Sequence, residues 1–479
     1  MKLFLQFILS CFVVISFFSC ENDFNGVQSQ LQFSKDTLTF DTVFTTIGSA
    51  TSKIMVYNPH NKEVVIDTIK LAGGANSSFR INVDGSKSAD HRFSNISIAG
   101  KDSLYILVEV KINPNAEDSP VLTQDSIVFS SKNINQRVLL EAFGQNVEIL
   151  RGKIFTRDTT LNDTKPYLIY DSLKVKKNVT LTIAQGTKIY FHNNASLLVY
   201  GNLIVNGTFE KPVEMKGDRL DKAMFDTPIP YKYIAGQWGG VLLLSKTGHH
   251  VLNNLDMSSG YAGLYLYNED RNFRPYLELN NCRLHNFLVY NIVAVNGDLR
   301  VTNSEITNSG SYTVYLSGGK HEFYHCTIAN FYSNSSGRPS NRDNTPALML
   351  MDLDKTLPME TKFKNCIISG TSSNEFILAS KFRDKYKGDF SNSYIKSNKK
   401  DSSSIFTNIR WSELKDTVFV NNRYDYKKGV YFNFVPDSVS PARGWADPAI
   451  SAQFPLDLNG KSRLEDGEPD AGAYEWYPK

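Results

Sequence analysis

The chain has 479 residues, with 52 Lys and Arg against 49 Asp and Glu, which gives a formal net charge of +3 at pH 7. This near balance excludes an extended nucleic-acid-binding surface, because such a surface needs a clustered excess of Lys and Arg. Hydrophobic residues make up 41% of the chain and aromatic residues 12%, which is enough material for more than one hydrophobic core. Val, Ile, Thr, Tyr and Phe alternate with polar residues almost throughout and helical periodicity is scarce, so we predict an all-β protein.

The chain starts with the pattern of an export signal. Lys2 is followed by an apolar run at 3–18 that is too short to span a bilayer. The segment 17–20, Phe-Phe-Ser-Cys, resembles the end of a lipoprotein signal peptide. The resemblance implies removal of residues 1–19 and acylation of Cys20, with more than one acyl chain because a single chain anchors only marginally. An ordinary secretory signal with an incidental cysteine is the alternative.

The residues after Cys20 indicate a location. Glu21-Asn22-Asp23 resembles the export signal of surface lipoproteins in the Bacteroidetes. This resemblance implies a protein attached by lipid to the outer membrane and exposed at the cell surface, with a periplasm-facing orientation as the alternative. Residues 20–30 carry no pattern, and we expect them to serve as a tether between the lipid and the folded chain.

Residues 31–148 consist of alternating apolar and polar runs separated by turns such as Asn58-Pro-His-Asn61. Strands of this length and spacing predict a small antiparallel sandwich. The order of Val-Tyr-Asn, Ile-Asp-Thr-Ile and a final Glu-Ala-Phe-Gly resembles immunoglobulin-like domains of bacterial surface and ciliary proteins. The segment contains no catalytic motif, so the resemblance implies a spacer or a binding module.

A second domain is predicted at 166–430. Its first part, 179–215, alternates with period two and turns at Gln185-Gly186 and Asn206-Gly207. Residues 216–236 contain two prolines and break the alternation. We expect them to loop out of the domain, and loops of this kind often carry function.

Residues 251–398 contain a repeat with a core period of 22 residues. Its frame is Asn, a small or apolar residue, any residue, an aliphatic residue, any residue, and then Asn, Ser or Gly. The six copies start at Asn254, Asn281, Asn303, His325, Asn365 and Asn392. A second short strand follows in the first five copies, at Leu264, Ile292, Val314, Leu348 and Phe376. One such unit cannot bury its own apolar face, so we expect the units to stack as rungs of a solenoid.

Stacking places equivalent residues of the repeat above one another. The first positions would form an asparagine ladder at a turn, because Asn tolerates the left-handed backbone conformation. The second and fourth positions would form two inward columns: Leu255, Cys282, Ser304, Cys326, Cys366 and Ser393, and Met257, Leu284, Ile306, Ile328, Ile368 and Ile395.

The cysteines support the same arrangement. Cys11 lies in the signal and Cys20 would be acylated, while the other three share the inward column. A buried thiol packs as a small hydrophobic group, so we predict that all three are reduced. Cys326 and Cys366 are the pair close enough for a disulfide. The cysteine spacing matches no zinc motif.

These columns, together with Trp238-Gly-Gly-Val241 at the start of a rung, resemble right-handed parallel β-helix proteins. A leucine-rich repeat requires Asn or Cys eight residues after its first leucine, and this sequence has Phe287, Ser309, Phe331 and Thr371 there. We therefore predict an N-terminal β-sandwich followed by a right-handed parallel β-helix and a C-terminal capping segment. The β-helix hosts lyases, hydrolases, adhesins and stalks, so the fold implies no single function.

The capping segment is predicted at 431–479. Its motifs, Asp457-Leu-Asn-Gly and Pro469-Asp-Ala-Gly-Ala-Tyr-Glu475, resemble the closing segment of exported bacterial β-helix proteins. We expect it to cover the last rung, whose open backbone edge would otherwise invite pairing. Asp457, Asn459 and Gly460 match the start of a calcium loop, but the later ligands are absent. No cofactor is predicted, with calcium as a minor alternative.

Candidate catalytic residues are few. Carbohydrate-cleaving β-helices use paired carboxylates, or a base beside a cation that neutralises a uronate. The candidates are Asp352 and Asp354 after a rung strand, and Lys381 and Arg383 in the next excursion, extended by Lys385 and Lys387. A solvated charged surface is the alternative for this run. His249, His250, His321 and His325 are expected at turns or at the surface.

Three functions fit this pattern. The preferred one is a lipid-anchored cell-surface protein whose β-helix binds a glycan or another surface component without cleaving it. The second is a polysaccharide lyase or glycoside hydrolase that acts on an anionic glycan along the 352–387 side. The third is a structural stalk or assembly subunit. The sequence favours the first because the loops between rungs lack a convergent acid/base set.

Overall fold

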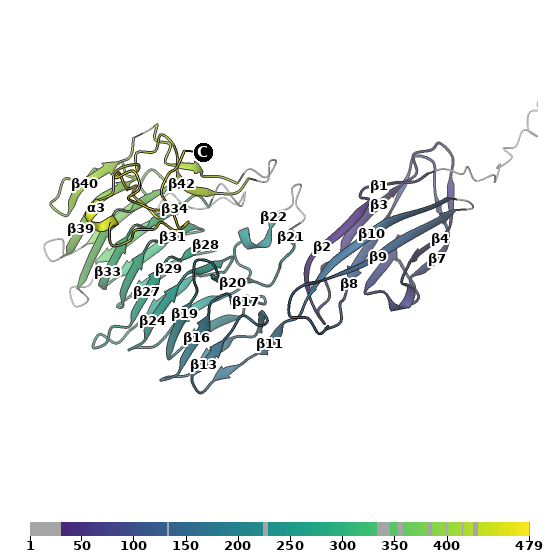
Figure 1. Cartoon of the computed structure of the whole chain (residues 1–479), viewed down its shortest axis with the longest axis horizontal. Helices are drawn as coiled ribbons and strands as arrows, with labels where there is room; N and C mark the ends of the chain where they lie inside the picture. The colour runs from purple at the N-terminus through teal and green to yellow at the C-terminus, as the bar shows by residue number, and fades with distance from the viewer. Residues whose placement is uncertain are drawn as a thin grey trace, which may run out of the picture. The chain divides into compact units, whose positions relative to one another are not determined.

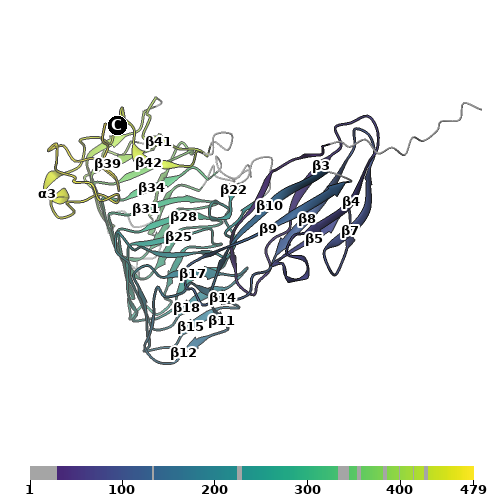
Figure 2. The same ribbon diagram turned by 45° about the vertical axis from the view of Figure 1, so that its right-hand side comes forward.

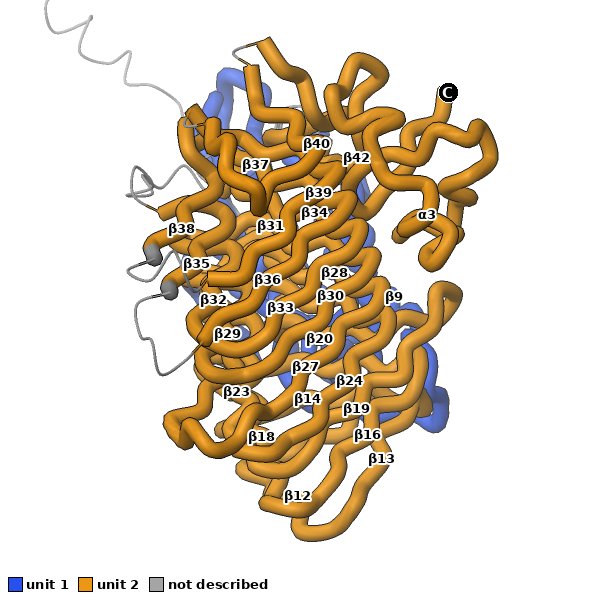
Figure 3. Tube along the Cα trace, turned by 90° about the vertical axis from the view of Figure 1, so that its left-hand side faces the viewer, with its two compact units in different colours: residues 1–145 blue, residues 146–479 orange. Residues whose placement is uncertain are grey.

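A computed structural model describes residues 30–131, 134–223, 229–332, 345–352, 358–380, 386–398, 400–413, 415–424 and 430–478. The chain divides into two compact units, Met1–Gln145 and Asn146–Lys479 (Figure 3). No helix in the described part is long and apolar enough to cross a membrane. The predicted signal peptide, Cys20 and nearly all of the predicted tether lie outside the described residues.

The first unit is a sandwich of two five-stranded sheets, and its core consists of inward residues such as Ile54, Phe79 and Phe129. The sequence predicts an antiparallel sandwich, but one pair of strands differs: β2 and β10 run parallel. The first sheet comprises β1 (Gln32–Phe33), β3 (Ser52–Tyr57), β8 (Ser103–Val110), β5 (Phe79–Val83) and β6 (Ser86–Lys87). The second comprises β2 (Thr37–Phe44), β10 (Ile134–Gln145), β9 (Val121–Ser131), β4 (Val64–Leu71) and β7 (Arg92–Ile98), and η1 (Gly74–Asn76) follows β4.

The second unit is a parallel β-helix, which confirms the predicted fold class. Each complete rung contributes two strands to a 19-stranded sheet and one strand to a 9-stranded sheet (Figure 1). In one rung these are β27 (Tyr276–Asn280), β28 (Arg283–Phe287) and β29 (Ile292–Val295). All three pair in parallel with the equivalent strands of the neighbouring rungs. We call the two sheets the long sheet and the short sheet.

The remaining strands follow the same order. The long sheet also contains β11 (Glu148–Arg151), β13 (Thr159–Leu161), β14 (Tyr167–Tyr170), β16 (Thr180–Ala184), β17 (Lys188–Phe191), β19 (Asn202–Asn206), β20 (Val213–Gly217), β24 (His249–Asn253), β25 (Leu255–Ser258), β30 (Asp298–Thr302), β31 (Glu305–Ser309), β33 (Gly319–Tyr324), β34 (Thr327–Asn330), β36 (Met359–Lys364), β37 (Ile367–Gly370), β39 (Lys387–Ile395) and β40 (Phe406–Trp411). The short sheet also contains β12 (Ile154–Phe155), β15 (Leu173–Val175), β18 (Ser196–Val199), β23 (Gly240–Leu243), β26 (Leu264–Tyr267), β32 (Val314–Ser317), β35 (Leu348–Asp352) and β38 (Phe376–Ser380).

The corner within the long sheet is the predicted asparagine ladder. The first residue of every repeat copy has a positive φ, between 47° at Asn254 and 56° at Asn281. Asn303 also donates from Nδ2 to Oδ1 of Asn281 in the neighbouring rung at 2.7 Å. A one-residue left-handed corner therefore turns the chain between the two long-sheet strands of each rung, as the sequence predicts.

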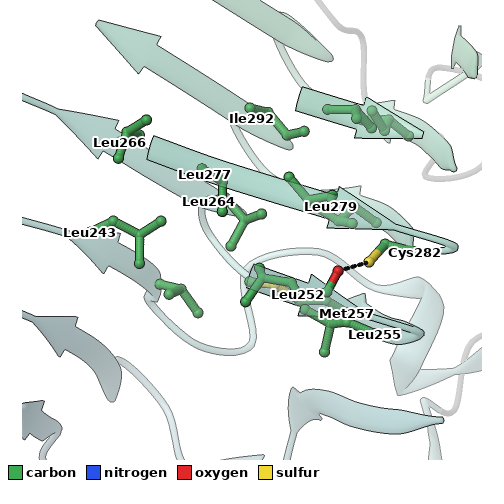
Figure 4. Close-up of a cluster of buried hydrophobic side chains, with 14 of the residues drawn as sticks. Leu243, Leu252, Leu255, Met257, Leu264, Leu266, Leu277, Leu279, Cys282 and Ile292 are labelled. Carbon is green, nitrogen blue, oxygen red and sulfur yellow. Dashed lines mark hydrogen bonds between the residues drawn. The ribbon is translucent and has the colours of Figure 1, made fainter. Parts of the chain in front are cut away.

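The two inward columns are also confirmed. All twelve of their residues are buried, and Met257, Leu284, Ile306, Ile328, Ile368 and Ile395 pair in one continuous register. Cys282, Cys326 and Cys366 are buried free thiols. Figure 4 shows Cys282 among leucines, with its Sγ bonded to the Leu252 carbonyl at 3.2 Å. Burial raises the pKa of Cys282 to about 12, so this thiol is unreactive packing material.

The solenoid starts earlier than the sequence pattern suggests. β11 pairs in parallel with β14, and β13 with β16, so residues ahead of 166 already form part of the stack. The expected interruption after β20 contains the short pair β21 (Lys222–Ala223) and β22 (Ile229–Pro230), followed by η2 (Tyr231–Tyr233).

The expectation that the four histidines lie at turns or at the surface is wrong for His250 and His321, which lie within strands, whereas His325 occupies a ladder corner. His250, His321 and His325 are completely buried, whereas His249 is exposed. His250 and His321 face the interior, in a column that holds Leu277 and Leu299 in the two rungs between them. Burial lowers the pKa of each to about 4. Both are therefore neutral packing residues.

The C-terminal segment covers a different surface from the one expected. After β41 (Phe419–Asn421) and β42 (Asn433–Pro436), residues 437–478 contain α3 (Pro448–Ser451) and otherwise no helix or strand. This segment lies against β31 and β34 (Figures 1 and 2). It therefore covers the outer side of the long sheet along several rungs, rather than the last rung alone. We call residues 437–478 the strap.

Candidate functional site

Of the candidate catalytic residues predicted from the sequence, the structure describes the backbone of Asp352 and the position of Lys387. Asp352 is the last residue of β35, and its backbone pairs in register with Ser380 at the end of β38. Asp354, Lys381, Arg383 and Lys385 lie outside the described residues. Lys387 starts β39 and is exposed. Asp352 and Ser380 therefore lie at the C-terminal ends of neighbouring strands. Among the described residues, these candidates form no site.

Two other surfaces of the solenoid carry clusters of polar or aromatic side chains. The first is the outer side of β20, β25, β28, β31, β34 and β37, which we call the strap face. Register places Glu214, Asp256, Arg283 and Glu305 in one outward column across four consecutive rungs. The parallel column beside it holds Lys216, Ser258, His285 and Thr307. The repeat frame leaves these positions unspecified because they do not face the core.

The strap docks on this face through the asparagine ladder. The Asn365 side chain accepts from the Asp447 backbone N–H at 2.8 Å and donates to the Asp447 carbonyl. His325, which replaces Asn in the ladder, lies 2.9 Å from the Ser451 hydroxyl through Nε2. Gly472 has a φ of +96°, and a Cβ there would lie 2.7 Å from Ile367. Only glycine fits this close approach of the strap to the sheet.

A buried ion pair fixes the middle of the strap. Arg463 donates to Glu475 at 2.7 Å and to the Asn303 side chain at 2.5 Å, and it is completely buried. The strap and β34, β37 and β39 also share a small hydrophobic core, which includes Ala329, Phe331, Ile367, Tyr394, Leu458, Ala471, Ala473 and Tyr474. Charge pairing and apolar burial together make the strap an integral layer of the fold.

Asp256 and His285 form the most accessible polar pair of the strap face. His285 Nε2 lies 3.3 Å from Asp256 Oδ1, and the Asp256 side chain is 42% exposed. The other ring nitrogen lies 3.0 Å from the Asn286 amide. Burial raises the pKa of Asp256, but the bond from His285 and the charges of Arg283 and Lys232 outweigh it, so the pKa lies below its usual range. Asp256 is an ionised carboxylate with a fixed orientation.

Tyrosines lie next to this pair. Tyr233 from η2 stacks on Tyr431 with ring centroids 4.4 Å apart and lies 6.2 Å from the His285 ring. Tyr424 stacks on Tyr431 at 5.1 Å. Burial, followed by the charges of nearby groups, raises the pKa of Tyr233 to about 12. This stack links η2 to residues near β41 and β42, above the polar columns.

The other carboxylates of the strap face are engaged within the chain. Glu214 is paired with Lys216 at 2.6 Å. Glu305 accepts from the Tyr474 hydroxyl and from the Thr307 hydroxyl. Glu305 is therefore partly covered by the strap, although it lies at an outward position of β31.

The second surface is the outer side of β23, β26, β29, β32, β35 and β38, which we call the tyrosine face. Tyr265 stacks on Tyr267 at 5.6 Å and on Tyr290 at 6.1 Å, and Tyr312 lies 5.6 Å from Tyr315. Tyr261 and Tyr200, at the margins of this face, are 54% and 44% exposed. The outward positions of the six strands that the structure describes are all uncharged, and they are Gly240, Leu242, Tyr265, Tyr267, Val293, Val295, Tyr315, Ser317, Met349, Met351, Ile377 and Ala379.

Sequence reasoning identified neither surface, although a signal was present. The second short strand contains tyrosine in two of its five copies, at alternate positions in Leu264-Tyr-Leu-Tyr267 and at Tyr315. Period-two alternation turns these tyrosines outward once the neighbouring leucines face the core. A contiguous patch of outward aromatic and aliphatic side chains, rather than a single one, marks a candidate binding surface.

No group of three or more metal-ligating side chains occurs in the described part of the chain. At the suggested calcium loop, Asp457 Oδ1 accepts the backbone N–H groups of Asn459 and Lys461, and Oδ2 accepts that of Glu475. These bonds close a turn within the strap. The Asp457 carboxylate therefore stabilises this turn.

Comparisons with known proteins define no family. No protein-family model matches the chain, and no curated protein matches its sequence. Among solved structures, a family 123 glycoside hydrolase from Clostridium perfringens is similar over 25% of this chain, with 11% identity and a TM-score of 0.18. The PapD-like domain 7 of human CEP192 is similar over 24% of this chain and 84% of that domain, with 11% identity and a TM-score of 0.16. The chain spans 30% of the hydrolase, and likenesses this weak carry no argument about function.

Proposed function

We propose that this protein is a lipid-anchored surface protein that binds a glycan on the tyrosine face without cleaving it. The observation that carries the proposal is the row of tyrosines on a face where the described outward positions hold no charge. A tyrosine ring offers a flat apolar surface with a polar hydroxyl at its edge. A sugar ring has the complementary form, with C–H groups on its faces and hydroxyls around its rim.

The tyrosines are partly ordered before any ligand arrives. Tyr265 already stacks on Tyr267 and on Tyr290, so less side-chain entropy is lost on binding. Burial raises the pKa of Tyr265, Tyr290 and Tyr315. Their hydroxyls therefore stay neutral throughout the physiological range, and each can both donate and accept a hydrogen bond.

A glycan array and affinity electrophoresis test the proposal. We expect wild type to bind at least one polysaccharide, and the double variant Tyr265→Ala/Tyr315→Ala to lose that binding. The matched control is Tyr57→Ala, which removes a tyrosine that is 40% exposed in the first unit and should leave binding unchanged. Equal binding by the double variant would place the glycan on another surface, and no glycan bound by wild type would favour a structural stalk or assembly subunit instead.

The membrane attachment is tested separately at Cys20. The short apolar run that ends in Phe-Phe-Ser-Cys supports acylation of this thiol. A fatty-acid probe should label wild type and Cys11→Ala, but not Cys20→Ala. Protease treatment of intact cells then distinguishes a surface location, in which the protein is digested, from a periplasm-facing one. Labelling of Cys20→Ala at the wild-type level would rule out the anchor.

A second candidate function rests on the Asp256–His285 pair. An exposed, ionised carboxylate oriented by a histidine and flanked by tyrosines is a plausible base for cleaving a polysaccharide. In that case wild type would release reducing ends or unsaturated products from a polysaccharide, and Asp256→Asn would abolish the release. The non-catalytic proposal is favoured because Glu214 and Glu305, the neighbouring carboxylates, are engaged within the chain.

A further inference from the structure

We infer that the ligand of the tyrosine face is an uncharged glycan chain that lies across the rungs, along the solenoid axis. This inference rests on the proposed function and specifies its ligand class. Three features of the described residues carry it: the register of the outward positions, the shape of the face, and its distribution of charge.

The register aligns the outward residues into a row that crosses the strands. Tyr265 pairs with Val293, which pairs with Tyr315, and the row continues to Met349 and Ile377. Neighbouring strands lie about 4.8 Å apart, so Tyr265 and Tyr315 are separated by roughly 9.6 Å along the axis. A chain along the axis would contact one outward residue of this row at each rung.

The shape of the face favours the same direction. Each of β26, β29 and β32 has four residues, so at about 3.3 Å per residue the flat part of a rung is only about 13 Å wide. The row from Leu242 to Ile377 crosses six strands and therefore extends for roughly 24 Å. An extended ligand finds its longest continuous contact along the axis.

The charge distribution selects an uncharged chain. Two charged side chains of the loop that follows β26 form ion pairs: Asp270 lies 3.2 Å from Lys246, and Arg274 lies 3.8 Å from Asp298. Glu269 accepts from the Tyr267 hydroxyl. An anionic chain would lose its hydration without gaining a charge partner on the outward positions of these six strands, which is unfavourable. The nearest charged outward position of this row, Lys174, lies two strands beyond Leu242. Neutral sugars carry no such penalty.

The competing arrangement is an anionic chain held by Lys381 and Arg383, which follow β38 in the sequence. The two arrangements differ in salt dependence, because cation contacts are screened by salt and aromatic stacking is not. They also differ in the residues on which binding depends. Both differences can be measured on the mature full-length chain.

The experiment titrates the mature protein with a soluble neutral glucan and with polygalacturonate, at low and high salt. Three proteins are compared: wild type, Tyr265→Ala/Tyr315→Ala, and the matched double variant Lys381→Ala/Arg383→Ala. We expect wild type to bind the neutral glucan with an affinity that salt does not change. The tyrosine variant should bind at least about tenfold more weakly, and the Lys381/Arg383 variant should match wild type.

The outcomes separate this inference from the proposed function. Salt-sensitive binding of polygalacturonate that is lost in the Lys381/Arg383 variant would overturn the inference and leave glycan binding intact. Binding of the neutral glucan that survives in the tyrosine variant would also overturn the inference, because the ligand would then lie elsewhere. Binding of neither polymer, in titration or on the glycan array, would overturn both proposals. Circular dichroism spectra of all three proteins verify that each variant is folded.

Discussion

The strap face and the tyrosine face belong to the same solenoid and share its interior, yet they differ in what lies on them. On the strap face, residues 437–478 cover Arg283, Glu305 and Thr327. On the tyrosine face, Tyr265 and Tyr315 point outward from the short sheet and are half-buried. Stacking of rungs thus fixes the core and leaves both outer faces free for other tasks.

Outward side chains differ between the two faces because the strap covers one of them. Where the strap packs, outward carboxylates are bonded to partners from the strap, as Glu305 is to Tyr474. On the tyrosine face, where no described segment packs, the outward residues of the six strands are uncharged and include Tyr265, Tyr267 and Tyr315. A covered face stabilises the fold, and an uncovered aromatic face is available to a ligand.

The interior shared by both faces should be the most sensitive part. Ile306→Asp places a carboxylate among buried aliphatic residues and should cost several kcal/mol, enough to unfold the solenoid. Glu305→Lys should cost about 2 kcal/mol, because it removes the bonds from Tyr474 and Thr307 and adds a cation close to Arg283. Thermal melts followed by circular dichroism compare the two. If Glu305→Lys were the more damaging change, the inward register would be wrong.

The strap should depend on its buried ion pair. Arg463→Ala leaves Glu475 buried without its charge partner and should destabilise the protein by about 3–5 kcal/mol. Lys461→Ala, in the same segment but exposed, is the matched control and should change stability by about 0.5 kcal/mol or less. Urea unfolding and limited proteolysis of residues 437–478 measure both variants. Equal stability of the two would show that the strap is not part of the cooperative fold.

Acid should weaken the interior through its buried histidines. The pKa of His250 and of His321 is about 4 in the folded chain and about 6.5 when unfolded. The unfolded state therefore binds protons more readily, and stability falls as pH decreases from about 6.5 to about 4, by roughly 3 kcal/mol for each histidine.

The double variant His250→Leu/His321→Leu provides the control for this prediction. Leucine already occupies the same column at 277 and 299, so the side chain should fit. The variant should show a weaker loss of stability between pH 6.5 and 4 in urea-unfolding measurements. A pH profile identical to that of wild type would mean that these histidines do not titrate on unfolding as proposed.

The smallest stability effect is expected on the tyrosine face. Tyr265→Ala removes a half-buried ring that contacts other tyrosines and should cost about 1 kcal/mol. Tyr474→Ala, on the strap face, removes a buried ring and should cost about 3 kcal/mol or more. Thermal unfolding of the two variants compares the faces directly. Similar losses would contradict the view that one face stabilises the fold and the other binds a ligand.

The sequence by itself determined the rungs of this protein. The asparagine corners, the column from Met257 to Ile395 and the second short strands all occur where the repeat places them. The physical reason is that each rung is built from short-range period-two alternation and from contacts with its immediate neighbours. Both are visible as spacing along the chain.

Only the tertiary structure decided what lies on the outer faces. Outward positions do not touch the core, so the repeat leaves residues such as Asp256 and His285 unspecified. The strap reaches this face through contacts between residues very distant in sequence, such as Arg283 and Tyr474, which are 191 positions apart. A sequence repeat does not predict such a pairing, because the pairing depends on which face the C-terminal segment can cover once all the rungs have stacked.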